Sequence, residues 1–85
     1  MDRPHRRADI VIQQIGHETV LQDRERQQVH VVNGTAAWIW QRLDGTRASD
    51  DIATEMADHF EVTVERAQRD VAEIVRSFGR LGLLA

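Results

Sequence analysis

The sequence has no cysteine among its 85 residues, which excludes disulfide bonds, a thiol nucleophile and a thiolate zinc site. It also lacks tyrosine. Its only serines, Ser49 and Ser77, suit a helix cap and a helix surface. Neither a glycine-rich phosphate loop nor a dinucleotide-binding fingerprint is present. We therefore expect no catalytic residues, no bound cofactor and no enzyme activity.

Strong net charge and long apolar runs are also missing. The net charge of −3 gives no general attraction to phosphate backbones, and no apolar run approaches the length that spans a bilayer. The basic start from Met1 to Asp9 is not followed by a signal-peptide core, because Gln13 and Gln14 interrupt the next apolar run. We expect a cytoplasmic protein without a nucleic-acid or membrane partner. The four histidines are scattered and predict no metal site: His5, His17, His30 and His59.

Three short β-branched runs in the first third of the chain predict strands. They cover residues 10–15, 19–21 and 29–32, and they are separated at Gly16 and at the charged segment from Asp23 to Arg26. Connections this short join antiparallel strands, because parallel strands need long crossovers. We expect Asp23 to Arg26 to be solvated and Gln28 to Val32 to be an edge strand. Residues 1–8 are expected to form a flexible N-terminal tail before a single domain over residues 9–85.

Apolar residues at helical spacing predict three helices in the rest of the chain. Asn33, Ser49 and Thr63 are the expected N-caps, and the first helix is expected to end at Asp44-Gly45. The predicted core faces are Ala36, Ile39, Trp40 and Leu43; Ile52, Ala53, Met56, Ala57 and Phe60; and Val64, Ala67, Val71, Ile74, Val75 and Phe78. A three-stranded antiparallel sheet followed by three helices is an α+β fold.

Two features of the predicted helices leave alternatives open. Trp38 lies nearly opposite the core face of the first helix, so its ring is either partly covered by the N-terminal segment or in contact with a partner. Either flank of the third helix, the one with Ser77 or the one with Ala72, can face the third strand. Its charged face is expected to be solvated, with ion pairs at helical spacing: Arg66–Asp70, Arg69–Glu73 and Glu73–Arg76.

The segment VNGTAAWIW at residues 32–40, followed by LDG at residues 43–45, resembles the PqqD-like proteins. The resemblance extends through DIA at residues 51–53, Ala67, DV at residues 70–71 and GLL at residues 82–84, so it covers residues 9–85. Members that serve pyrroloquinoline quinone synthesis commonly have a cysteine where this chain has Leu43. We therefore do not assign the chain to that pathway, and another peptide pathway, such as a lasso-peptide system, fits equally well.

The resemblance implies a winged-helix-like domain that recognises the leader segment of a ribosomally made precursor peptide. The leader would add as a strand to the third β-strand and lie beside the third helix, with Val32 turned to the core. The implied peptide-binding residues are Gln28, Val29, His30, Val31, Val32, Arg66, Arg69, Asp70 and Glu73. The implied partners are the leader and a peptide-modifying enzyme, which would be a protease, a cyclase or a radical enzyme.

The alternative function is that of a winged-helix DNA-binding regulator, since three helices beside a small sheet can place a recognition helix in the major groove. Acidic residues alternate with the arginines of the third helix, and the whole chain is acidic. Both features count against groove binding, which favours a basic stripe. An exposed edge strand also permits a homodimer.

Overall fold

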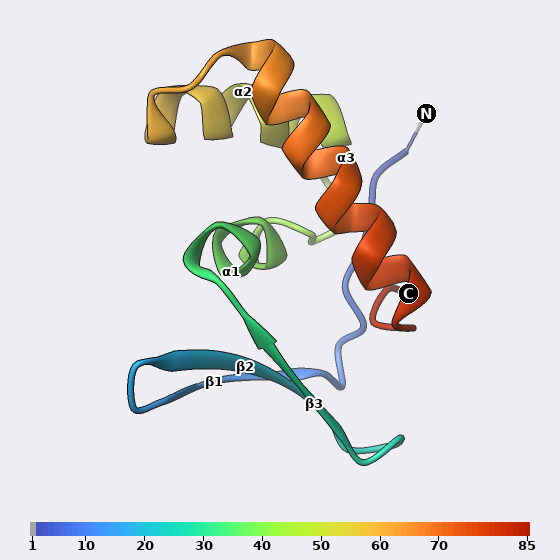
Figure 1. The fold of residues 1–85 in the computed structure, drawn as a ribbon. Helices are drawn as coiled ribbons and strands as arrows, with labels where there is room; N and C mark the ends of the chain where they lie inside the picture. Colours follow the sequence, from blue (N-terminus) through green and yellow to red (C-terminus); the bar gives the residue numbers. More distant parts are fainter. Residues whose placement is uncertain (1) are drawn as a thin grey trace.

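The computed structural model describes residues 2–85 as a three-stranded sheet followed by three helices (Figure 1). The strands are β1 (Val11–Ile15), β2 (Glu18–Asp23) and β3 (Gln28–Val32), and the helices are α1 (Gly34–Gln41), α2 (Ser49–Phe60) and α3 (Val64–Arg80). Both strand pairs are antiparallel, in the order β1-β2-β3. The predicted α+β fold is confirmed.

The sheet presents one face to the helices and the other to solvent. Leu21 pairs with His30 across β2 and β3, and side chains alternate along a strand, so both residues share the inner face with Val32. Leu21 is fully buried and Val32 packs against the core. On the outer face Val29 and Val31 are 58% and 61% exposed. The register therefore places Val32 as the resemblance implied.

The helices form one core with the inner face of the sheet. The predicted N-cap of α1 is confirmed, since the Asn33 side chain accepts a hydrogen bond of 2.8 Å from the backbone N–H of Ala36. Behind this cap Trp40 is buried, and its ring meets that of Phe78 edge to face at 5.2 Å. Thr63 caps α3 in the same way. Within residues 2–85, no helix is long and apolar enough to cross a bilayer.

Three expectations about the helix ends are wrong. The helix α1 already ends at Gln41, before the expected Asp44-Gly45. The N-cap of α2 is Ala48, whose backbone N–H donates to the Asp51 carboxylate at 3.1 Å, whereas Ser49 is the first helical residue and its hydroxyl bonds Asp2. Phe60 and Val64, both assigned to the core, are 37% and 42% exposed. They lie on either side of the turn that joins α2 to α3, at the edge of the helical layer.

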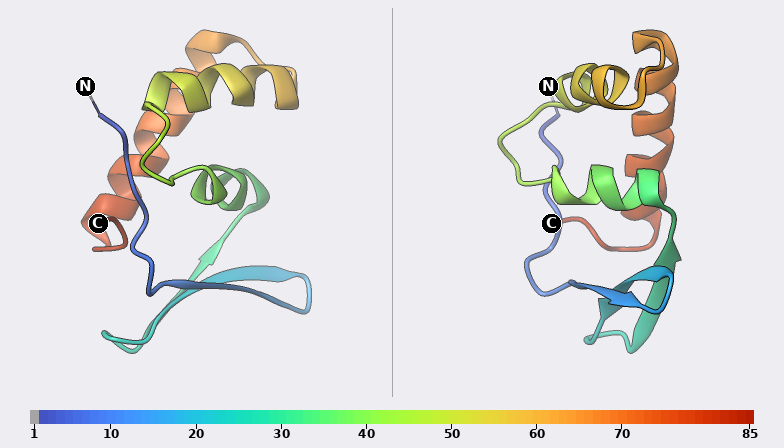
Figure 2. Two further views of the ribbon diagram at one scale, coloured as in Figure 1. Left: turned by 180° about the vertical axis from the view of Figure 1, so that it is seen from behind. Right: turned by 90° about the vertical axis from the view of Figure 1, so that its left-hand side faces the viewer.

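The N-terminal segment, expected to be a flexible tail, runs past the helices toward the sheet (Figure 2). Its backbone is hydrogen-bonded to the rest of the domain at His5, Arg6 and Arg7. The backbone N–H of Arg6 donates to the carbonyl of Leu43 at 2.7 Å, and that of Arg7 donates to the carbonyl of Leu83 at 3.0 Å. The carbonyl of His5 accepts from Ala85 at 2.7 Å. Met1, the first residue of the predicted tail, lies outside the described residues.

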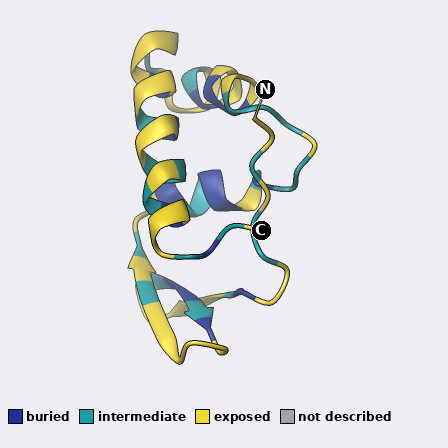
Figure 3. Cartoon of the chain, turned by 90° about the vertical axis from the view of Figure 1, so that its right-hand side faces the viewer, coloured by how far each residue is buried: buried dark blue, intermediate teal, exposed yellow. Residues whose placement is uncertain are grey.

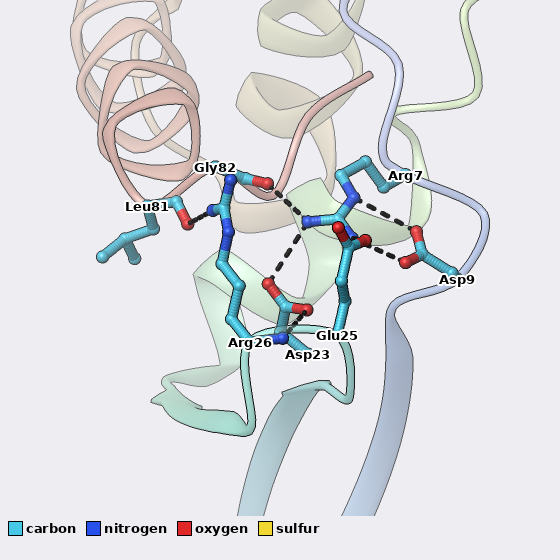
Figure 4. Close-up of polar contacts among 7 residues, drawn as sticks. All are labelled: Arg7, Asp9, Asp23, Glu25, Arg26, Leu81 and Gly82. Atoms are coloured by element: carbon cyan, nitrogen blue, oxygen red, sulfur yellow. Dashed lines mark hydrogen bonds and ion pairs between the residues drawn. The ribbon is translucent and has the colours of Figure 1, made fainter.

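Arg7 is the centre of a charged group that we call the Arg7 cluster, formed with Asp9, Asp23 and Glu25 (Figure 4). Its guanidinium lies 2.6 Å from Asp9, 3.2 Å from Asp23 and 2.9 Å from Glu25. The hydrogen bond between Arg7 and Asp9 raises the pKa of Arg7 and lowers that of Asp9. Asp23 is fully buried, so the expectation that it is solvated is wrong. Its buried charge is matched by a cation from the N-terminal segment.

The Trp38 ring is partly covered, and residues of α2 together with Arg42 lie against it. His59 stacks on it and Phe60 meets it edge to face, each with a centroid distance of 5.5 Å. The Arg42 guanidinium lies 3.6 Å from the ring centroid. Trp38 therefore helps to join α1 to the end of α2.

Candidate functional site

The open edge of β3 is the first element of the candidate site (Figure 3). Among residues 2–85, β3 pairs only with β2, so its other edge has backbone N–H and C=O groups without strand partners. Most of β3 is also exposed, as the burial colours of Figure 3 show. Such an edge is ready to pair with another extended chain.

A groove of about 430 Å³ lies between this edge and α3. We call it the β3–α3 groove. It is lined by Val29, His30, Val31, Val32, Asn33, Ala36, Ile74, Ser77, Phe78 and Leu81. Ile74, Ser77 and Leu81 are spaced three and four residues apart, so they lie on one face of α3 and just beyond its end. Most of the lining residues are apolar, although polar atoms form about half of the exposed lining surface. The small side chain of Ser77 lies in the middle of the α3 wall.

The β3–α3 groove continues toward the start of α1 as a depression of about 300 Å³. Its lining shares Asn33 and Ile74 with the groove and adds Thr35, Asp70 and Glu73. The Arg66 guanidinium lies 3.7 Å from the Asp70 carboxylate and offsets part of its charge. The site is therefore apolar beside β3 and acidic beside the start of α1.

The residues predicted for the site fall into three groups. Val29, His30, Val31 and Val32 line the β3–α3 groove, and Asp70 and Glu73 line its acidic continuation. Gln28 lies instead in a depression at the β2–β3 turn. Arg66 reaches the site only through its ion pair with Asp70, and Arg69 lies on the outer face of α3 beside Arg76 and Arg80. The flank of α3 that faces β3 is the one with Asp70 and Ser77.

Sequence reasoning missed several residues of the groove wall. Ile74 and Phe78, which the helical periodicity predicts in the core, also line the groove. Leu81, which was given no role, lies just past α3 and is 38% exposed there. The helical wheel placed Ser77 on one flank of the core stripe, which was the available signal, but it could not show which flank meets β3.

The geometry of the site suits an extended ligand. An open strand edge can bond the main chain of a peptide, and an adjacent apolar groove can take every second side chain. The imidazole Nε2 of His30 is buried and has no hydrogen-bond partner among residues 2–85. The fold and site are thus those of a small α+β domain with the geometry used for strand addition.

The sequence comparison identifies the family. The model of coenzyme PQQ synthesis protein D (PqqD) matches residues 18–84, and the chain belongs to this family. A search of curated protein sequences finds no match.

Three solved structures are similar to the chain. Lasso peptide synthetase B1 complexed with its leader peptide has a TM-score of 0.84 and 30% sequence identity, covering 99% of both chains. TbiB1 in complex with the TbiA(beta) leader peptide has a TM-score of 0.80 over 94% of this chain and 93% of that one, and at 19% identity it supports the fold alone. PqqD from Xanthomonas campestris has a TM-score of 0.60 and 25% identity, covering 99% of this chain and 93% of its own.

Proposed function

We propose that this chain is a non-catalytic recognition domain that binds the leader segment of a ribosomally made precursor peptide in the β3–α3 groove. The observation that carries the proposal is the open edge of β3 directly beside an apolar groove. A chain that is 30% identical over nearly its whole length was solved with a leader peptide, which supports the same ligand class here.

The leader would bind as a fourth strand beside β3. The five residues of β3 offer an edge of about 17 Å, enough for roughly five residues of an extended peptide. Main-chain hydrogen bonds would supply much of the affinity whatever the leader sequence, while the groove selects the side chains that point toward α3. Ile74, Phe78 and Leu81 favour apolar side chains there.

The acidic continuation gives the bound leader a direction. Asp70 and Glu73 lie at the end of the groove where β3 passes into α1. A basic leader residue at that end would be attracted to these carboxylates, and an acidic one would be repelled. Arg66 offsets part of the Asp70 charge, so Glu73 is the stronger determinant of this preference.

The bound leader would then be delivered to a peptide-modifying enzyme, which is a protease, a cyclase or a radical enzyme. We favour a lasso-peptide system over pyrroloquinoline quinone synthesis, because the TM-score to lasso peptide synthetase B1 exceeds that to PqqD from Xanthomonas campestris. Leu43, where the latter pathway commonly has cysteine, is fully buried and contributes to packing.

Amide hydrogen exchange with and without bound peptide tests this proposal. The probes are the leader peptide of lasso peptide synthetase B1 and a panel of other lasso-peptide leaders. We expect new protection in β3 and chemical-shift changes around Ile74 and Leu81, with β1, the other edge of the sheet, as an internal control. Changes confined to α1 and the Asp44-Gly45 turn would place the ligand elsewhere and overturn the site.

A further inference from the structure

Three arginines form a second distinctive surface on the outer face of α3. Arg69, Arg76 and Arg80 are spaced seven and four residues apart, so they lie within about 20° of one line along the helix. All three are exposed, and they border a shallow depression of about 440 Å³ together with Ala72 and Glu73. We call these three residues the arginine stripe.

The arginine stripe has no partner among residues 2–85. The expected pairs of Glu73 with Arg69 and Arg76 do not form, and Arg66–Asp70 is the one ion pair found within α3. Six of the chain's eleven basic residues, all of them arginines, bond a carboxylate or a carbonyl. The other five arginines make no such bond within residues 2–85, and three of them form the stripe. A protein with a net charge of −3 thus concentrates its unpaired cations on one helix face.

The arginine stripe lies next to the β3–α3 groove without belonging to it. Glu73 lines both the acidic continuation of the groove and the depression of the stripe, so the two surfaces meet at this residue. The stripe spans about 16 Å along α3, and its three residues are exposed. A peptide extended in the groove leaves at the groove's ends. A peptide confined to the groove therefore leaves the stripe free for a second molecule.

We propose that the arginine stripe is the docking surface for an acidic face of the enzyme that modifies the bound peptide, an inference that rests on the proposed function. Guanidinium groups bind carboxylates through paired hydrogen bonds, which makes a row of arginines specific for a matching row of acids. Ala72 leaves a hollow between the arginines where a partner helix can approach closely. An antiparallel helix with acids at positions i, i+4 and i+11 would match the stripe.

Two other occupants are less compatible with this surface. Glu73 lies within the depression and Asp70 close to it, and both would repel the phosphates of a nucleic acid. The acids of α2 in a second copy lie on a different element from the stripe, so such a contact would be head-to-tail and would tend to form open chains. An acidic partner protein avoids both difficulties.

The test is fluorescence anisotropy with a labelled helical peptide that carries glutamates at i, i+4 and i+11, compared with the same peptide carrying glutamines. We expect the full chain to prefer the glutamate peptide. The triple variant Arg69→Gln/Arg76→Gln/Arg80→Gln should bind it at least tenfold more weakly. Arg3→Gln/Arg24→Gln removes two other unpaired arginines and should change binding less than twofold. Leader-peptide affinity should be the same for all three proteins.

Each other outcome overturns a stated part of the proposal. Equal binding of the glutamate peptide by wild type and triple variant, with leader binding intact, removes the docking surface and leaves the proposed function standing. Tighter stripe-dependent binding of a 20-base-pair duplex makes the stripe a nucleic-acid surface. Stripe-dependent self-association in sedimentation makes it a contact between copies. Failure to bind any leader overturns the proposed function and, with it, the proposal that the partner of the stripe is a peptide-modifying enzyme. Binding of the glutamate peptide still shows whether the stripe binds an acidic helix.

Discussion

The Arg7 cluster and the β3–α3 groove both lie at the C-terminal end of α3, but their polar groups are paired to different extents. In the cluster, the buried Asp23 accepts from the Arg7 guanidinium and from the backbone N–H of Arg26. The Arg26 side chain in turn bonds the carbonyl of Leu81 at 3.1 Å. Across Leu81 lies the groove, where one edge of β3 is open and His30 Nε2 has no partner among residues 2–85.

This difference separates what holds the fold from what is open to a ligand. Buried polar groups are normally hydrogen-bonded, and the Arg7 cluster follows that rule because it joins the N-terminal segment, the β2–β3 turn and the C-terminal residues. An open strand edge and exposed apolar residues contribute little to folding. They are therefore the groups that remain free to bind a partner. The comparison makes predictions for both regions.

The largest expected effect is on stability, from the substitution Asp23→Ala. It removes the buried partner of Arg7 and should cost about 3 kcal/mol, the low end for a broken buried ion pair, because Arg7 keeps Asp9 and Glu25. Glu25→Ala is the matched control, since it removes a carboxylate that is 74% exposed from the same arginine and should cost at most about 1 kcal/mol. Urea unfolding measures both. Similar losses would show that burial does not distinguish the two pairs.

The second prediction concerns the bond between Arg26 and Leu81. Gly82 has φ of +72°, and an added Cβ would lie 1.7 Å from the Arg26 guanidinium. Gly82→Ala should therefore displace Arg26 and cost about 2 kcal/mol from backbone strain plus a lost hydrogen bond. Gly16→Ala, at φ of +61° with nothing within 4 Å, should cost about 1 kcal/mol from strain alone. In a double-mutant cycle, Arg26→Ala should add nothing once residue 82 is alanine; additive losses would contradict the mechanism.

The sequence predicts the two regions to different extents for a physical reason. The strands, the Asn33 cap and the buried face of α1 depend on local periodicity, so they could be predicted. The Arg7 cluster could not, because its cation and its buried carboxylate are sixteen positions apart and only the folded chain brings them together. When this long-range contact is unknown, a charged segment such as Asp23 to Arg26 is expected to be solvated.

The site was also only partly predictable. The edge strand follows from the order of the elements, and its four residues from Val29 to Val32 do line the groove. Which residues form the opposite wall depends on how α3 is rotated relative to the sheet. A helical wheel shows positions around the helix but not that rotation. The sequence therefore predicts Arg69 as a site residue although it lies on the outer face, and it does not predict Ile74 or Leu81.

The third prediction fills the groove and leaves the fold unchanged. Ser77 lies in the middle of the groove wall, so Ser77→Trp should block the space for the leader and weaken its binding at least tenfold, or about 1.4 kcal/mol. Ala72→Trp places the same ring on the outer face of α3 and should leave leader affinity nearly unchanged. Isothermal titration calorimetry with a binding lasso-peptide leader compares the two variants. Equal affinities would exclude the groove as the binding site.

The smallest expected effect is a pH dependence that arises in the Arg7 cluster. The hydrogen bond from Arg7 lowers the pKa of Asp9 below its ordinary 3.8. A carboxylate with a lowered pKa in the folded state stabilises the protein fully above the ordinary value, and this contribution is lost as the pH falls through the lower one. The stability difference between wild type and Asp9→Asn should therefore be constant from about pH 7 to pH 5, decrease progressively as the pH falls past 3.8, and vanish only below the lowered folded-state pKa. Asp58→Asn changes a carboxylate with no ion pair or side-chain hydrogen bond in the described chain, so it should not reproduce this pattern. Denaturant midpoints measured from about pH 7 down to about pH 2 check the prediction, and a difference that stays constant over that whole range would show that Asp9 acts through packing and not through its charge.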